Sequence, residues 1–372
     1  MTENADVVSV MAAAPDPRGA AEGSGREGRG RLPVTVAVLA AALPVTILLG
    51  VALGATVIPV GDVVRYVGAA LTGGTITSGE VPAYSIIWQV RVPRVLLAAV
   101  VGAGLSVVGV AVQAMVRNAL ADPFVLGISS GASVGASLVV AFGLFTGLGI
   151  YAVSTAALLG ALGASVLVYL AARGRAGLSP LRLVLTGIAL AYGFQAMTSL
   201  VVFLAPNYQA ASTVLFWLLG GLGAATWGSL PLPAAGVLCC VALLLRYARA
   251  LDVLAMGDET AASLGVDAMA TRRWTFVLTS VVTGLLVAVS GPVGFVGLVM
   301  PHLVRMLVGS THRRVLTVAP LAGACFIVWA DVVSRTFFSP QELPLGVVTA
   351  LVGVPVFVVI LRRRGYLFGG GR

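Results

Sequence analysis

The chain has 372 residues, of which 59% are hydrophobic and 10% are charged. Soluble domains hold about 45–50% apolar and about 25% charged residues, so this composition excludes a soluble protein and a largely disordered one. All 23 basic residues are arginine. Because a P-loop needs its lysine at the phosphates and a Schiff base needs a lysine amine, the sequence also excludes a Walker-type ATPase and a lysine-dependent enzyme.

Metal-ligating residues are rare. The chain has three cysteines and two histidines. Cys239, Cys240 and Cys325 lie in apolar runs without metal-ligand spacing, so we expect them to be buried apolar thiols. No histidine cluster or pair of carboxylates marks a catalytic centre, which argues against a membrane-embedded enzyme. We therefore expect no catalytic residue, no metal and no cofactor bound by this chain.

The tail at residues 1–32 is rich in glycine, alanine and charged residues and has no apolar period. We predict that it is a disordered cytoplasmic tail. The apolar run that follows is too long, and starts too late, for a cleavable signal peptide, so it is expected to be a first span. A transmembrane domain then occupies residues 33–364, with a cytoplasmic tail at 365–372. Spans are expected near residues 33–57, 95–116, 124–145, 151–172, 183–204, 231–245, 275–290, 294–309, 316–335 and 344–361.

The stretch at 286–301 admits two interpretations, one broken span or a tight re-entrant turn between two spans. Pro292 and the flanking glycines favour the turn, which gives ten spans. The positive-inside rule agrees with an even number and places both termini in the cytoplasm. With that topology, 19 of the 23 arginines are inside and four are outside. The outer four are Arg65, Arg91, Arg94 and Arg335.

Three of the outer arginines lie at the ends of spans. Arg91 and Arg94 flank a proline where the second span begins, and Arg335 ends the ninth span, four residues after Asp331. Such arginines can receive an acidic partner through charge-assisted hydrogen bonds. Two other readings stay open: the side chains could snorkel to lipid phosphates, and Arg335 could pair with Asp331 on one helix face.

Polar side chains within the spans are few. Gln113, Gln195 and Asp331 stand out, and intramembrane polar residues are functional candidates by default. Gln195 could face a cavity, or it could hydrogen-bond a neighbouring helix. Glycine recurs at every fourth position of 127–135. This spacing predicts close helix packing and does not require a pore.

The longest cytoplasmic loop is expected at 246–274. Its segment at 251–266 has good helix formers after an acidic start and a glycine at the expected stop, which predicts a short helix pair outside the bilayer. A groove of a soluble partner could hold Leu254, Met256 and Leu264. An interfacial amphipathic connector is the alternative.

Seven segments, in a fixed order, carry a family resemblance. They are Arg91-Val-Pro-Arg94, Gln113 with Arg117-Asn-Ala-Leu-Ala-Asp-Pro123, Leu126-Gly-Ile-Ser-Ser-Gly-Ala132, Leu254-Ala-Met-Gly-Asp-Glu259 with Ser263-Leu-Gly265, Gly294-Phe-Val-Gly-Leu-Val-Met-Pro-His302, Ala330-Asp-Val-Val-Ser-Arg335 and Glu342-Leu-Pro-Leu-Gly-Val-Val-Thr-Ala350. Together they resemble the permease subunit of ABC importers for ferric siderophores, haem and cobalamin (type II, FecCD-like). The resemblance covers about residues 58–364. Ala119 and Ser130 depart from the usual proline and asparagine, which affects only the expected loop geometry.

The resemblance implies an all-α polytopic membrane fold of about ten transmembrane helices that works by alternating access in the cell (inner or plasma) membrane. It implies a second permease copy, identical or a close paralogue, two ATPase subunits that bind ATP and Mg, and an extracytoplasmic solute-binding protein. No nucleic acid partner is expected. The implied cargo is a bulky iron chelate, a ferric siderophore first, with haem and cobalamin as alternatives. The missing lysine independently places the ATP chemistry in another chain.

The resemblance also implies roles for particular residues. Arg91, Arg94 and Arg335 match arginines that, in the cobalamin importer permease, meet acidic residues of the binding protein. The segment at 251–266 matches the coupling region that contacts the ATPase. Its candidate residues are Leu254, Met256, Gly257, Asp258, Glu259, Ser263, Leu264 and Gly265.

The fifth and tenth spans of two copies line the pathway in that family, which places Gln195 and Thr349 near it. The main rival function is a secondary transporter driven by protons or sodium. Such transporters usually need membrane carboxylates as relays. Asp331 is the clear candidate in this sequence, and it is expected near the outer rim, so the ATP-driven importer is favoured.

Overall fold

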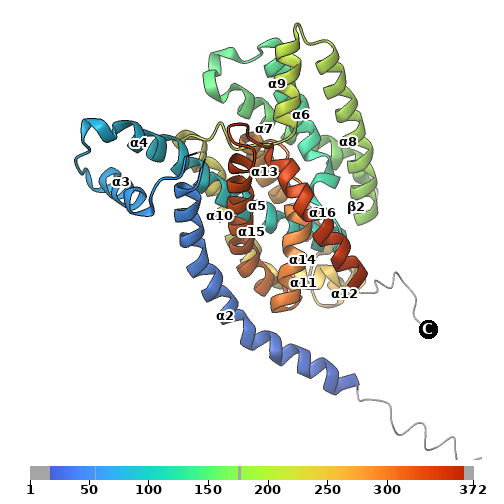
Figure 1. Cartoon of the computed structure of the whole chain (residues 1–372). Helices are drawn as coiled ribbons and strands as arrows, with labels where there is room; N and C mark the ends of the chain where they lie inside the picture. The colour runs from blue at the N-terminus through green and yellow to red at the C-terminus, as the bar shows by residue number, and fades with distance from the viewer. Residues whose placement is uncertain (1–16, 55, 175–176, 364–372) are drawn as a thin grey trace, which may run out of the picture.

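The computed structural model describes residues 17–54, 56–174 and 177–363. These residues form a helical bundle with one short strand pair, β1 (Arg173–Gly174) and β2 (Gly177–Leu178) (Figure 1). The ten main helices are α2 (Pro17–Ala52), α5 (Val92–Val116), α6 (Ile128–Phe142), α7 (Ala152–Ala172), α8 (Pro180–Phe203), α10 (Pro231–Arg246), α13 (Ala268–Ser290), α14 (Val296–Val308), α15 (His312–Thr336) and α16 (Leu345–Arg363).

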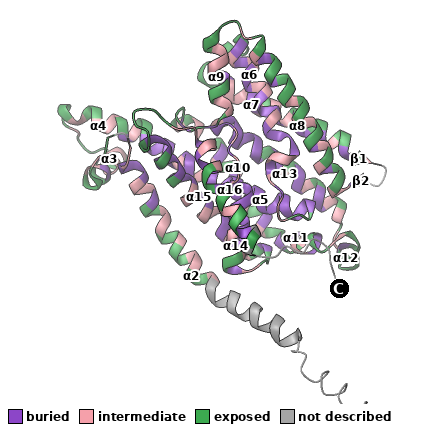
Figure 2. Ribbon diagram, turned by 45° about the vertical axis from the view of Figure 1, so that its right-hand side comes forward, coloured by how far each residue is buried: buried purple, intermediate pink, exposed green. Residues whose placement is uncertain are grey.

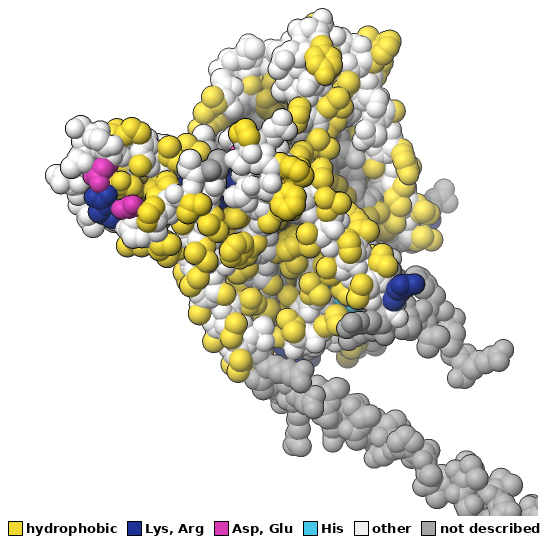
Figure 3. All heavy atoms as spheres, in the orientation of Figure 1, with side chains coloured by type: hydrophobic (Ala, Val, Ile, Leu, Met, Phe, Trp, Pro, Cys, Tyr) yellow, Lys and Arg dark blue, Asp and Glu magenta, His cyan; other side chains and the backbone are white. Residues whose placement is uncertain are grey.

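Helix length and composition confirm the expected membrane class. Seven described helices are long and apolar enough to cross a membrane, and three shorter apolar helices, at 128–142, 296–308 and 345–360, complete the expected ten. On the face shown in Figure 3, hydrophobic side chains cover most of the bundle, and charged side chains gather on the projecting lobe of α3 and α4 and near the lower end. An all-α polytopic membrane protein is therefore confirmed.

Shorter helices fill the connections. A lobe that contains α3 and α4 projects to one side of the bundle, α9 lies at the upper end, and α11 and α12 lie at the lower end (Figure 1). Of these, only the pair α11 and α12 is expected from the sequence. The short elements are α3 (Val60–Thr72), η2 (Ser78–Glu80), α4 (Val81–Ser85), η3 (Ile86–Arg91), η4 (Pro123–Leu126), η5 (Thr146–Tyr151), α9 (Tyr208–Leu218), η6 (Trp227–Ser229), α11 (Ala248–Ala255) and α12 (Asp258–Ser263).

Helix α5 forms the centre of the bundle and is buried along almost its whole length (Figure 2). Its glycines allow the neighbouring backbones to approach closely. A Cβ atom at Gly102 would lie 2.1 Å from the carbonyl oxygen of Gly323 in α15, and one at Gly109 would lie 2.0 Å from that of Gly297 in α14. Small residues therefore serve helix packing here, as they commonly do in membrane bundles.

Replacing Gly109 with alanine is expected to destabilise the bundle by about 1–3 kcal/mol, because the new methyl group forces α5 and α14 apart. Gly163 in α7 is the matched control, because a Cβ atom there would meet nothing within 4 Å. The same change at Gly163 should be neutral or slightly stabilising, since alanine favours a helix. Thermal unfolding in detergent measures both variants, and equal melting temperatures would contradict the packing role of Gly109.

The chain breaks between α13 and α14, as the turn interpretation of 286–301 predicts. Helix α13 ends at Ser290, Gly291 follows with φ of 62°, and Phe295 precedes α14 with φ of 68°. The break is covered by the segment after α9, where the Gly221 N–H donates to the Ser290 carbonyl at 2.8 Å. Irregular backbone inside a membrane protein needs such protein cover for its polar groups.

The N-terminal segment differs from the expectation of disorder over 1–32. From Pro17 onward the structure continues the helix of the first span as part of α2. Extending an existing helix avoids the unfavourable nucleation step, and proline fits the first turn of a helix. Residues 1–16 of the expected tail and the expected tail at 365–372 lie outside the described residues.

Candidate functional site

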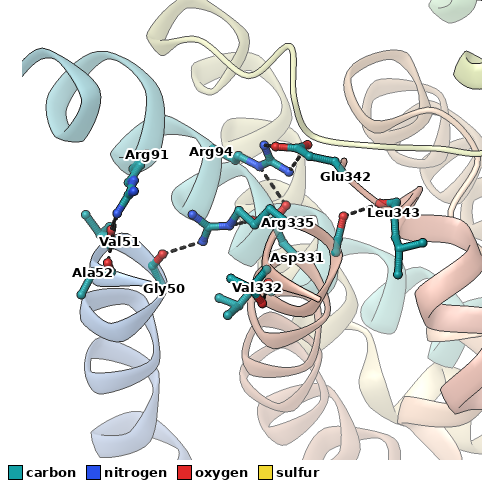
Figure 4. A network of polar contacts seen from close by, with 12 residues as sticks. Gly50, Val51, Ala52, Arg91, Arg94, Asp331, Val332, Arg335, Glu342 and Leu343 are labelled. Carbon is teal, nitrogen blue, oxygen red and sulfur yellow. Dashed lines mark hydrogen bonds and ion pairs between the residues drawn. The ribbon is translucent and has the colours of Figure 1, made fainter. Parts of the chain in front are cut away.

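Five charged residues gather at one end of the bundle: Arg91, Arg94, Asp331, Arg335 and Glu342 (Figure 4). We call them the arginine cluster. It joins the end of η3 and the start of α5 to the end of α15 and the loop that leads into α16. Four of its members are buried, whereas the Glu342 side chain is 48% exposed. Buried charges need close partners to be tolerated, and the cluster supplies them.

Arg94 lies at the centre of the cluster. Its Nε donates to Asp331 Oδ1 at 2.9 Å. Its Nη1 and Nη2 donate to the two carboxylate oxygens of Glu342, each at 2.9 Å. This two-pronged geometry is the strong form of an arginine–carboxylate pair. It ties α5 both to α15 and to the loop before α16.

Arg335 and Arg91 attach α2 to the cluster. Arg335 Nε lies 3.1 Å from Asp331 Oδ2, which confirms the pairing on one helix face, and Nη2 donates to the Gly50 carbonyl. Arg91 Nη1 donates to the carbonyls of the last two residues of α2, each at 3.0 Å. Carbonyls at a helix end have no partner within the helix. Arg91 therefore caps α2 and complements the negative end of its dipole.

The arginines expected to dock a partner are thus not free charges at a rim. Arg91, Arg94 and Arg335 are 6%, 7% and 5% exposed, and all three are bonded within the chain. Their inward orientation also differs from snorkelling to lipid phosphates. Docking stays a prediction, and Glu342 is the exposed member of its pair with Arg94. Glu342 was not singled out from the sequence, although an acidic residue seven positions after Arg335, in the loop between the ninth and tenth spans, was the available signal.

A cavity of about 710 Å³ lies beside the cluster. Arg94 and Glu342 line it, together with the aromatic side chains of Tyr151, Phe216 and Trp217. The other lining residues are apolar or neutral. The Arg94–Glu342 pair is therefore the charged feature of the cavity wall.

At the opposite end, the expected helix pair is present as α11 and α12. Gly257, with φ of 119°, separates the two helices, and Gly265, with φ of 74°, follows the second. Leu254 is fully buried, whereas Met256 and Leu264 are 67% and 58% exposed. Of the three apolar residues expected to meet a partner, only Met256 and Leu264 are accessible.

Asp258 anchors the helix pair to the bundle. Its Oδ1 lies 2.6 Å from Nη2 of the buried Arg272 and 3.8 Å from Nη1 of Arg117. Arg272 belongs to α13, and Arg117 follows α5. Glu259 and Ser263 are exposed on α12. The helix pair thus presents an exposed surface on α12 while Asp258 is held by two arginines.

A second anchor was not expected from the sequence. Asp252 of α11 accepts the backbone N–H of His312 at 2.8 Å and lies 2.7 Å from His312 Nδ1. His312 is the first residue of α15, so Asp252 satisfies one of the free N–H groups at that helix start. Helix α15 therefore holds the helix pair at one end and carries Asp331 and Arg335 near the other.

The remaining polar candidates take different places. Gln113 is buried and joins α5 to α14, because its amide donates to the Gly297 carbonyl at 3.2 Å and its oxygen accepts from Arg305. Gln195 is exposed on α8. Thr349 is fully buried, and its hydroxyl donates to a carbonyl of its own helix at 3.1 Å. Gln195 and Thr349 do not meet within the chain.

Comparisons with known proteins agree with this architecture. The chain is 39% identical over 326 residues to YvrB, an ABC transporter permease of Bacillus subtilis. The alignment covers 87% of this chain and 91% of YvrB. The chain is also 41% identical over 283 residues to the hemin transport permease HmuU of Yersinia pestis. That alignment covers 75% of this chain and 84% of HmuU. A solved structure described as an inward-facing metal-chelate type ABC transporter matches with a TM-score of 0.76 and 30% identity, over 90% of this chain and 100% of that one.

These likenesses, together with the ten apolar helices, define a multi-pass ABC importer permease. The profile of the FecCD transport family matches residues 42–363, and the chain belongs to that family. The family resemblance read from the seven sequence segments is therefore confirmed.

Proposed function

We propose that this chain is the permease subunit of an ATP-driven importer that moves a bulky iron chelate, a ferric siderophore in the first instance, into the cytoplasm by alternating access. The observation that carries the proposal is helix α15, which joins the arginine cluster to the helix pair. Coupling between two distant sites needs an element that both sites bias. The relatives named as hemin and Fe(3+) dicitrate permeases support an iron-containing cargo.

The helix pair is the proposed contact for two ATPase subunits, which bind ATP and Mg. Exposed Met256 and Leu264 supply apolar contact of the kind a groove accepts. Glu259 and Ser263 add exposed polar groups beside them. The other assigned residues, Leu254, Gly257, Asp258 and Gly265, shape the pair and hold it against the bundle.

A second permease copy is proposed to pack beside α8 and α16, with the pathway between the two copies. Both helices carry exposed apolar side chains, including Leu185 and Phe203 on α8 and Leu351 on α16. Gln195 lies exposed on α8 and is the proposed polar contact for cargo. Thr349 contributes through its helix, since its side chain is buried. We propose that both termini lie in the cytoplasm and that the complex resides in the plasma or inner membrane, as the positive-inside rule predicts.

The arginine cluster is the proposed docking site for the extracytoplasmic solute-binding protein. It lies at the end of α15 opposite the helix pair, and three arginines face two carboxylates within it. An excess of positive charge favours an acidic partner and speeds its association.

Purification of the chain from membranes under mild detergent tests the proposal. We expect a Walker-motif subunit and a solute-binding protein to co-purify, and the complex to show vanadate-sensitive ATP hydrolysis. Recovery of the chain alone, without hydrolysis, would favour a gradient-driven secondary transporter.

Haem is the second candidate cargo, because the hemin permease is 41% identical and covers 75% of this chain. Titration of the co-purified binding protein with haem and with a ferric siderophore separates the two. Quenching of its fluorescence by the siderophore alone is the expected result, and quenching by haem alone would assign the importer to haem.

A further inference from the structure

The Arg94 guanidinium is bound by two carboxylates that differ in solvent exposure. Asp331 binds its Nε, and the Asp331 side chain is 1% exposed near the C-terminal end of α15. Glu342 binds the two terminal nitrogens, and its side chain is 48% exposed. Asp331 therefore fixes where the guanidinium lies, while Glu342 occupies the end of it that faces the cavity.

The backbone around Glu342 is fixed independently of its side chain. The Leu343 N–H donates to the Ser334 carbonyl at 2.8 Å, and the Ser334 hydroxyl donates back to the Leu343 carbonyl. The Leu345 N–H donates to the Gly220 carbonyl at 3.0 Å. Because these bonds hold the loop on α15 and on the segment after α9, the Glu342 carboxylate can leave Arg94 by side-chain rotation alone.

We propose that Glu342 is an internal stand-in for a carboxylate of the solute-binding protein, which displaces it from Arg94 when the two proteins dock. This inference rests on the proposed docking function. The exchange conserves charge balance, because Arg94 keeps two carboxylates before and after. The released Glu342 carboxylate rotates into the solvent. Because its side chain is already 48% exposed, the rotation requires little change in its surroundings.

The stand-in has two consequences. Without a partner, Glu342 keeps the terminal nitrogens of Arg94 bonded to a carboxylate, while Asp331 holds only its Nε. When the binding protein is present, Glu342 competes with its carboxylate for Arg94. The apparent affinity of the permease for the binding protein is therefore lowered according to the fraction of time that Glu342 holds Arg94. A protein surface that lacks a carboxylate at this position gains nothing from displacing Glu342, which gives specificity by competition.

The test measures the affinity of the co-purified, cargo-loaded binding protein for the whole permease–ATPase complex in lipid nanodiscs, by fluorescence polarisation at fixed ionic strength. In Glu342→Gln the amide oxygen still accepts a hydrogen bond from Arg94, but the competing charge is gone. We expect binding about tenfold tighter than in the wild type. Glu342→Asp keeps the charge on a shorter side chain that cannot reach both nitrogens, and should fall between the two.

Glu80→Gln is the matched control. Glu80 pairs with Arg65 on the α3–α4 lobe, outside the arginine cluster, so its loss should leave the affinity unchanged. Melting temperatures of all variants exclude misfolding as the cause of a change.

Arg94→Lys separates the inference from the function on which it rests, because lysine keeps the charge without the two-pronged geometry. Weaker binding in Arg94→Lys with tighter binding in Glu342→Gln supports the inference. Weaker binding in Arg94→Lys with unchanged or weaker binding in Glu342→Gln overturns the stand-in role and leaves docking intact. Unchanged binding in Arg94→Lys overturns docking at this cluster, and the stand-in role with it.

Discussion

Replacing Asp331 with asparagine is expected to destabilise the folded chain by about 3–5 kcal/mol. Asp331 holds Arg94 at 2.9 Å and Arg335 at 3.1 Å, and its side chain is 1% exposed. Without its charge, Arg335 loses its ion pair and Arg94 keeps only the carboxylate of Glu342. Removal of one partner from a buried ion pair leaves an uncompensated charge. The loss of stability in Asp331→Asn should therefore exceed the loss caused by neutralising any single surface charge of the chain.

Reversible unfolding in mixed micelles measures the free energy of unfolding for this variant. Asp62→Asn is the control, since Asp62 pairs with the exposed Arg65 at 3.6 Å and exposed pairs contribute about 0–1 kcal/mol. If Asp331→Asn were as stable as Asp62→Asn, the arginine cluster would not hold α5 and α15 together.

Aspartates in place of both Met256 and Leu264 are expected to release the ATPase subunits and abolish ATP-driven uptake. These side chains are 67% and 58% exposed at the lower end of the bundle, whereas Leu254 beside them is fully buried. Apolar anchors at an interface can each contribute about 2 kcal/mol or more to binding. The double change should therefore weaken ATPase binding at least tenfold, measured as the ATPase subunit retained on the purified permease.

Leu71→Asp is the control for this variant. Leu71 is 72% exposed on α3, in the lobe away from the helix pair, and the change introduces a carboxylate of the same kind, one in place of two. We expect normal ATPase retention in Leu71→Asp. Normal retention in the Met256 and Leu264 double variant would remove the coupling assignment from α11 and α12.

Hydropathy sufficed to predict the spans, because each needs a long apolar run. The orientation that the arginines indicate stays a prediction. The break after Ser290 was also predictable from Pro292 and its glycines. Helix α9 was missed because its 11 residues are too few for a span. Its start signal was present, since Asn207 caps the helix by accepting the Ala210 N–H at 2.8 Å.

The candidate site could be predicted only in part. The Asp331–Arg335 pair follows from helix spacing, which is local. The Arg94–Glu342 and Asp252–His312 contacts join residues 248 and 60 positions apart, and no local pattern encodes such a distance. Burial of the three arginines was likewise not readable from the sequence, because it depends on how α2, α5 and α15 converge.

We propose that this permease imports an iron chelate at the expense of ATP. The direct measurement is uptake of a radiolabelled ferric siderophore into proteoliposomes that hold the purified permease–ATPase complex, with the binding protein on the outside. We expect uptake with ATP inside and no proton or sodium gradient, and none with the gradient alone. Uptake driven by the gradient in the absence of ATP would contradict the proposed ATP-driven import.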